Sequence, residues 1–166
     1  MEYQRALLVG TGAGLSASLA RLFSKDGMKV AVASRHPERL AELCGETGAK
    51  AFGCDAAQPA QVAALFAEVE KAMGAPDVAV YNASYRTRGP ITELDPAEVE
   101  RALAVTAYGA FLVAQQAARR MAPKQHGAIL LTGASAGVKG YPQSAPFAMG
   151  KFALRGLAQS MARELA

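Results

Sequence analysis

An apolar run that breaks into glycines and then into a helical pattern constrains this chain most. Residues 6–9 are apolar and predict a buried strand, glycines stand at positions 10, 12 and 14, and Leu15, Leu19 and Leu22 follow at helical spacing. A strand, a glycine turn and a helix in this order are typical of a dinucleotide-binding unit. Glycine permits a positive φ and a close approach of phosphate, and a helix N-terminus attracts its charge. The alternative is a strand-to-helix turn that only needs a flexible backbone.

The glycine spacing fits the dinucleotide pattern G-x-G-x-x-G in two registers. Counted from Gly10, the sixth position is Leu15; counted from Gly12, it is Ala17, an accepted variant of the third glycine. Both registers place the backbone of residues 10–14 beside the phosphates. The predicted cofactor-binding residues of this loop are Gly10, Thr11, Gly12, Gly14 and Leu15.

Composition narrows the class of protein. The 166 residues are 51% hydrophobic and 19% charged, which predicts a single folded domain over residues 1–166. The net charge of +4 is spread along the chain, and no basic run indicates a nucleic-acid partner. No apolar run is long enough for a membrane span, and the N-terminus leads directly into the first strand without a signal peptide, so we expect a cytoplasmic protein.

The cysteines and histidines indicate no special chemistry. Cys44 and Cys54 are isolated and predicted to be reduced. His36 and His126 have no ligand-like partners nearby in the sequence, so no metal site is expected.

Strand patterns alternate with helix patterns five times. Strands are expected at residues 6–9, 29–34, 48–55, 77–82 and 127–132. Helices are expected at residues 15–26, 35–44, 59–73, 95–121 and from about 145 to the end. This alternation predicts an α/β fold with a doubly wound, Rossmann-type parallel sheet of strand order 3-2-1-4-5. Ligands then bind beyond the carboxyl ends of the strands.

The end of the second strand indicates which dinucleotide binds. An acidic residue there accepts the ribose hydroxyls of NAD, whereas an arginine accommodates the 2′-phosphate of NADP. This strand ends in Ser34 and Arg35, which favours NADP and leaves NAD possible. The alternative is a solvated surface arginine. Asp55 is a candidate acceptor for the adenine amine, with a helix-flanking turn residue as the alternative.

Together these elements resemble the short-chain dehydrogenase/reductase family over all 166 residues. The matching parts are residues 9–16, 54–55, 81–84 (Tyr-Asn-Ala-Ser, close to the family's N-N-A-G), 127–137 and Lys151. The resemblance implies further cofactor contacts from Asn82, Ala83 and Lys151, the last of which holds the nicotinamide ribose. Ser16 stands where the family's loop has its final glycine.

The chain resembles a divergent branch of that family, because it departs at the catalytic positions. The family's tyrosine lies four residues before its lysine, and this position is Phe147. Ala134 stands at the catalytic serine, with Ser135 one residue later, and Thr106 stands at the asparagine of the long helix. Of the family's catalytic residues, Lys151 alone is retained.

Two classes of function follow. The resemblance implies an oxidoreductase that transfers hydride between NADP(H) and a small carbonyl or alcohol compound. Ser135, Tyr141 and Tyr81 are candidate replacement proton donors, with loop packing as the alternative for each. Loss of the tyrosine instead favours a dinucleotide-binding sensor or partner subunit without catalysis, because one positioned acid–base group contributes about 10²–10⁴-fold in rate.

The resemblance also concerns assembly. Family members usually continue beyond the last helix into two further strands and a substrate-covering segment, so we expect strand 127–132 to be an exposed edge. Two helices carry small or apolar residues on more than one side, which predicts a homodimer or homotetramer. These residues are Ala102, Ala107, Ala110, Ala114, Ala117, Ala153, Leu154, Leu157 and Ala158.

Overall fold

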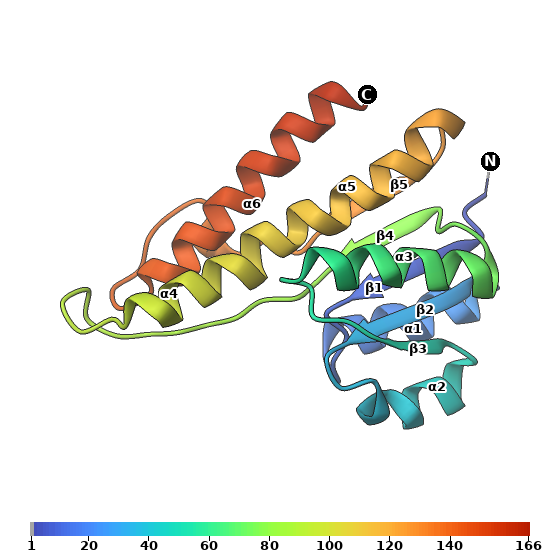
Figure 1. Cartoon of the computed structure of the whole chain (residues 1–166), viewed down its shortest axis with the longest axis horizontal. Helices are drawn as coiled ribbons and strands as arrows, with labels where there is room; N and C mark the ends of the chain where they lie inside the picture. Colours follow the sequence, from blue (N-terminus) through green and yellow to red (C-terminus); the bar gives the residue numbers. More distant parts are fainter. Residues whose placement is uncertain (1) are drawn as a thin grey trace.

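Five parallel strands form the sheet at the centre of the chain, which a computed structural model describes over residues 2–166. The strand order is β3-β2-β1-β4-β5 (Figure 1), which confirms the predicted doubly wound fold. The strands are β1 (Arg5–Val9), β2 (Lys29–Ser34), β3 (Lys50–Gly53), β4 (Val78–Tyr81) and β5 (Ala128–Leu131). Val9 lies opposite both Ala33 and Tyr81, so the carboxyl ends of the three central strands meet at one edge.

Helices cover both faces of this sheet. They are α1 (Leu15–Lys25), α2 (Ala41–Thr47), α3 (Pro59–Met73), α4 (Pro96–Leu103), α5 (Gly109–Met121) and α6 (Ala145–Glu164). Side chains alternate along β1: Ala6 and Leu8 pack toward α1 and α2, whereas Leu7 and Val9 pack toward α3 and α5. In Figure 1 α6 lies alongside the segment from α4 to α5, and it contacts both α4 and the turn that follows α4.

Two predicted helices differ in detail from the structure. The helix expected at residues 35–44 begins with a tighter 3₁₀ turn, Pro37–Leu40, before α2. The helix expected at residues 95–121 is interrupted by a π-helical turn, Ala104–Tyr108. The wider turn leaves the carbonyl of Val105 free to accept a hydrogen bond from the buried hydroxyl of Tyr81. A hydrogen bond between segments far apart in the chain therefore stabilises the π-helical turn that interrupts the long helix.

The small residues predicted to form a subunit interface lie mostly inside the chain, so that part of the prediction is wrong. Ala110, Ala117 and Leu154 belong to the core between the sheet and α3, and Ala102 and Ala114 are no more than 1% exposed. Other apolar side chains of these helices face solvent instead. These are Tyr108, Phe111, Met149 and Phe152.

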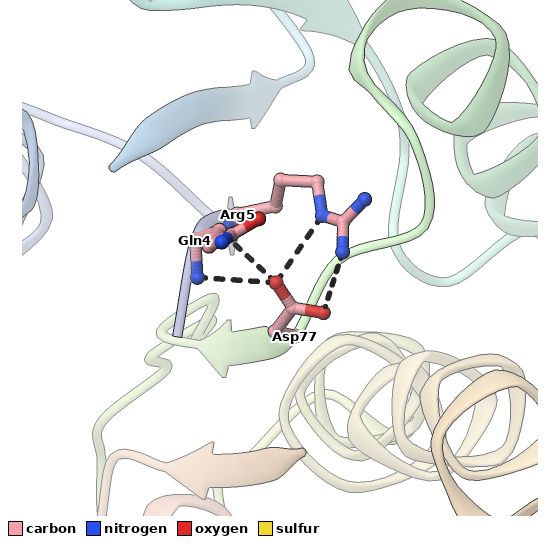
Figure 2. Close-up of polar contacts among 3 residues, drawn as sticks. All are labelled: Gln4, Arg5 and Asp77. Atoms are coloured by element: carbon pink, nitrogen blue, oxygen red, sulfur yellow. Dashed lines mark hydrogen bonds and ion pairs between the residues drawn. The ribbon is translucent and has the colours of Figure 1, made fainter. Parts of the chain in front are cut away.

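Hydrogen bonds among Gln4, Arg5 and Asp77, here called the polar clamp, lie at the opposite, amino end of the sheet (Figure 2). One oxygen of the buried Asp77 carboxylate accepts the backbone N–H groups of Gln4 and Arg5, both at 3.1 Å, and the Nε–H of Arg5 at 3.2 Å. The other oxygen accepts from a terminal nitrogen of Arg5 at 3.0 Å. Burial by itself raises the pKa of Asp77, but the bonds from Arg5 and Gln4 outweigh it and hold the pKa below its usual value. The clamp joins the start of β1 to the start of β4.

Three further predictions concern the edge of the sheet, the cysteines and membrane spans. Within residues 2–166, β5 pairs with β4 alone, so it forms an edge of the sheet. Cys44 and Cys54 are both free thiols. Between residues 2 and 166, no helix combines the length and the apolar character that crossing a bilayer requires.

Candidate functional site

A cavity of about 630 Å³ opens where the loops after β1, β2, β3 and β4 converge. Parallel strands bring these loops to one edge, so residues far apart in the sequence share one wall. The predicted contacts that line it are Gly10, Thr11, Gly12, Ser34, Arg35, Asp55, Asn82 and Ala83. Three predicted contacts, Gly14, Leu15 and Lys151, lie outside its lining.

The glycines of the first loop have different roles. Gly10 has a φ of +85°, and a side chain there would overlap the backbone of Ala83. The N–H groups of Gly10 and Thr11 both lie within hydrogen-bond distance of the carbonyl of Ala33, at 3.0 and 2.9 Å. By contrast, an added Cβ at Gly12 or Gly14 would meet no atom within 4 Å. Gly10 is therefore required by the fold, whereas Gly12, which lines the cavity, and Gly14 are uncrowded.

Ser16 ties the glycine loop to the end of β4. Its buried hydroxyl accepts a hydrogen bond from the Asn82 side-chain nitrogen at 2.8 Å and donates to the carbonyl of Gly10 at 3.4 Å. A glycine at this position could form neither bond. Sequence reasoning found Ser16 and Asn82 separately but missed their contact, because it depends on the pairing of β1 with β4.

The cavity wall beyond β2 is basic. Arg35 and Arg39 are exposed and form no ion pair within residues 2–166. Arg21 also lines the cavity but is paired with Glu46 at 2.7 Å. The sequence prediction missed Arg39, although its position four residues after Arg35 was a usable signal. Other lining residues it missed are Arg21, His36, Leu40, Glu42, Leu43, Ala56, Tyr85 and Val105.

Asp55 and Cys54 form the wall after β3. One oxygen of Asp55 accepts the N–H of Ala57 at 3.0 Å, as a turn residue would, while the residue also lines the cavity. Burial, reinforced by the charge of Asp55, raises the pKa of Cys54 to about 11. The Cys54 thiol is therefore protonated at neutral pH and is a poor nucleophile.

A second polar region lies on α6, away from the cavity. Lys151 is only 5% exposed, and its Nζ donates to the backbone carbonyl of Thr132 at 2.7 Å. Burial lowers the pKa of Lys151. Its Nζ lies 5.7 Å from the centre of the Phe147 ring, because residues four apart share one face of a helix. A tyrosine at position 147 would thus lie beside the ammonium group.

The candidate replacement donors differ in accessibility. Ser135 opens a short 3₁₀ turn, Ser135–Gly137, and is exposed, as is Ala134 before it. Tyr141 is 41% exposed. Tyr81 is buried, its hydroxyl donates to the carbonyl of Val105, and burial raises its pKa, so its hydroxyl is already used in packing.

Thr106 secures the loop after β4 from the π-helical turn. It is 1% exposed; its hydroxyl accepts the N–H of Tyr85 at 3.3 Å and lies 3.4 Å from the hydroxyl of Ser84. An added Cβ at Gly150 of α6 would lie 2.9 Å from the Thr106 methyl group. Thr106 therefore packs α6 against the loop.

Nearly the whole chain is similar in sequence to known proteins. Residues 4–166 match the family description "short chain dehydrogenase". Versicolorin reductase 1 from Aspergillus parasiticus is 33% identical over 164 residues, which are 95% of this chain and 62% of the relative. Momilactone A synthase from Oryza sativa subsp. japonica is 36% identical over 168 residues, 96% of this chain and 60% of the relative. The chain thus spans about three fifths of these relatives.

Solved structures agree in fold along nearly the whole chain. A short-chain type dehydrogenase/reductase from Mycobacterium marinum is 32% identical with a TM-score of 0.92, covering 98% of this chain and 67% of that one. A variant of actinorhodin polyketide ketoreductase, solved with NADPH, is 26% identical with a TM-score of 0.94, covering 98% of this chain and 65% of that one. By its sequence match and its architecture, this chain belongs to the short-chain dehydrogenase family.

Proposed function

We propose that this chain is the dinucleotide-binding part of an oxidoreductase that uses NAD(P), with a preference for NADP, and acts on a small carbonyl or alcohol compound. In the reductive direction, a carbonyl, NADPH and a proton give an alcohol and NADP⁺. The observation that carries the proposal is Arg35, which lines the cavity and forms no ion pair within residues 2–166, beside Gly12, around which an added Cβ would meet no atom within 4 Å.

The residues present fit such a cofactor. The open space at Gly12 and Gly14 suits a pyrophosphate, and the guanidinium of Arg35, joined by Arg39, suits a 2′-phosphate. Lys151 is the candidate for the nicotinamide ribose. When bound, the nicotinamide supplies the hydride. The chain's part is to orient the two reactants and to hold a proton at the substrate oxygen, for which Ser135 and Tyr141 remain the candidates.

The relatives support this reading. The curated matches include a reductase and several dehydrogenases, and the ketoreductase variant was solved with NADPH. They act on different compounds, so they do not identify a substrate for this chain.

A second candidate function is dinucleotide binding without catalysis, as in a sensor or partner subunit. The observation that favours it is Phe147, an apolar ring beside Lys151 where the family places its phenol. Both candidates require the same cavity and differ only in turnover.

We also infer that the chain assembles as a homodimer or homotetramer. The support is the apolar surface on the helices, where Tyr108, Phe111, Met149 and Phe152 are 41–49% exposed. Light scattering at micromolar concentration tests this, and a monomer contradicts it.

The cofactor proposal is tested by fluorescence titration with NADPH and NADH. We expect NADPH to bind at least about tenfold more tightly, because a charge-assisted hydrogen bond is worth about 1.5–3 kcal/mol. Arg35→Ala should remove most of this preference, and Arg39→Ala a smaller part. Arg119→Ala, an exposed arginine of α5, is the matched control and should change nothing. Equal affinities in the unmodified chain would contradict the NADP preference, and no binding of either nucleotide would contradict the function.

A further inference from the structure

A free arginine lies over the ring that replaces the family's tyrosine. The Cζ atom of Arg86, in the loop between β4 and α4, is 4.7 Å from the centre of the Phe147 ring. The Nζ of Lys151 lies 5.7 Å from the same centre. The N–H of Gly89 donates to the carbonyl of Gln143 at 3.2 Å, which ties the loop to the segment before α6. Two cations therefore approach one apolar ring.

Arg86 has no anionic partner among residues 2–166. Its exposed side chain forms no ion pair and no hydrogen bond there. The acids that follow in the chain are used elsewhere: Asp95 accepts the N–H of Ala97 at 2.9 Å, and Glu98 accepts a tyrosine hydroxyl at 2.6 Å. Glu93 and Glu100, the other acids between Arg86 and the end of α4, form no ion pair with Arg86. The guanidinium of Arg86, beside Phe147, is therefore available to bind an anionic ligand.

The geometry limits which ligand fits. A guanidinium that lies over an aromatic ring uses its face for that contact and keeps its N–H edge free. This edge matches the two oxygens of a carboxylate, which accept parallel hydrogen bonds. Lys151 is deeper and already donates to Thr132, so Arg86 is the more available of the two cations.

We propose that the substrate of this site is a carbonyl or alcohol compound that carries a carboxylate, and that Arg86 binds this carboxylate. This inference rests on the proposed function, since it names the class of substrate for the same site. It also gives the Phe147 ring a role, namely to hold the guanidinium beside the place where the substrate oxygen would lie.

The test compares charged and uncharged probes of matched shape. Binding of phenylacetate and of phenylacetamide is measured by calorimetry, with and without saturating NADP⁺, on the unmodified chain, on Arg86→Met and on Arg88→Met. Arg88 is a matched control because it is an exposed arginine in the same loop with no contact to Phe147. Reduction of phenylpyruvate and of its methyl ester by NADPH is measured in parallel. Thermal unfolding checks that each variant is folded.

We expect the unmodified chain and Arg88→Met to bind phenylacetate at least about tenfold more tightly than phenylacetamide. Arg86→Met should bring the two affinities within about threefold, and titration of the same variant with NADPH checks that the dinucleotide site is intact. A folded Arg86→Met that keeps the preference overturns the inference, and so does an unmodified chain without one.

The two proposals fail in different ways. If NADPH binds but phenylacetate is not preferred, the inference falls and the proposed function stands. If no dinucleotide binds but the preference exists and depends on Arg86, the proposed function falls and the carboxylate site stands as a binding site of its own.

Discussion

The glycine loop and the residues around Lys151 both lie at the carboxyl ends of the strands, yet they differ in which groups stay free. At the glycine loop, Gly12 and Gly14 face open space and Arg35 is unpaired within residues 2–166. At α6, Lys151 donates to a backbone carbonyl and Phe147 presents a ring without a hydroxyl. The two regions thus differ in that the glycine loop is open at Gly12 and Gly14, whereas the ammonium group of Lys151 is already hydrogen-bonded within the chain.

The largest effect should come from adding hydroxyl groups at positions 134 and 147. Phe147→Tyr together with Ala134→Ser should raise kcat/KM for carbonyl reduction by about 10³-fold, and more than either change alone. A phenol beside Lys151 would be acidified by the ammonium charge. NADPH oxidation over a panel of carbonyls measures the effect.

The control for the double variant adds Lys151→Met, which should remove the gain. If the unmodified chain is already fast and the double variant is slower, another group carries the proton, with Tyr141 or Ser135 as the candidates. In that case the two regions are both catalytically equipped, and the comparison no longer holds.

Two substitutions in the glycine loop after β1 distinguish a glycine that the fold requires from one that faces the proposed ligand site. Gly10→Ala should lower the free energy of unfolding by about 3 kcal/mol, because its Cβ would overlap the backbone of Ala83 at a positive φ. Gly12→Ala is the matched control, with open space around it, and should cost less than about 0.5 kcal/mol. It should nevertheless weaken NADPH binding. Urea unfolding and fluorescence titration measure the two quantities, and equal unfolding effects would contradict the assignment.

At the amino end of the sheet, the contact of Asp77 with Arg5 and Gln4 provides a structural reference, because none of these residues lines the cavity. Asp77→Ala should lower the free energy of unfolding by about 2 kcal/mol, less than for a fully buried pair because Arg5 is 30% exposed. Since the pKa of Asp77 is lower in the folded chain than in the unfolded chain, its contribution is complete above about pH 5 and is lost as the pH falls through about 3.9 toward the folded value.

Urea unfolding of the two proteins from pH 7 to pH 3 tests the role of Asp77. The difference in stability between them should shrink as the pH falls. A constant difference would show that packing, rather than the charge, accounts for the effect of the substitution.

The smallest effect concerns the contact between Ser16 and Asn82. Ser16→Ala removes the 2.8 Å bond from the Asn82 side chain and should cost about 1 kcal/mol. Ser18→Ala, an exposed position on the same helix, should change stability by less than about 0.5 kcal/mol. If the two substitutions have equal effects in urea unfolding, Ser16 does not stabilise the loop.

Local pattern was sufficient for most elements. The boundaries of β2 and α3 agree with the predicted residues 29–34 and 59–73, because apolar runs and a proline at a helix start act over a few neighbours. The π-helical turn in the long helix was missed, because it depends on the hydroxyl of Tyr81, which reaches Val105 across the fold. The small residues of that helix were assigned to a subunit interface, because periodicity shows which faces are apolar and not what covers them.

The sequence by itself determined the order of strands and helices, the parallel sheet and the identity of the loops at its carboxyl edge, since short-range periodicity and chain connectivity are enough for these. Only the tertiary structure decided which side chains of those loops are already used. Asn82 is hydrogen-bonded to Ser16, Lys151 is hydrogen-bonded to Thr132, and Arg86 lies over Phe147 without an ion pair to any of residues 2–166. Such pairings depend on distances between segments far apart in the chain, and residue spacing carries no information about them.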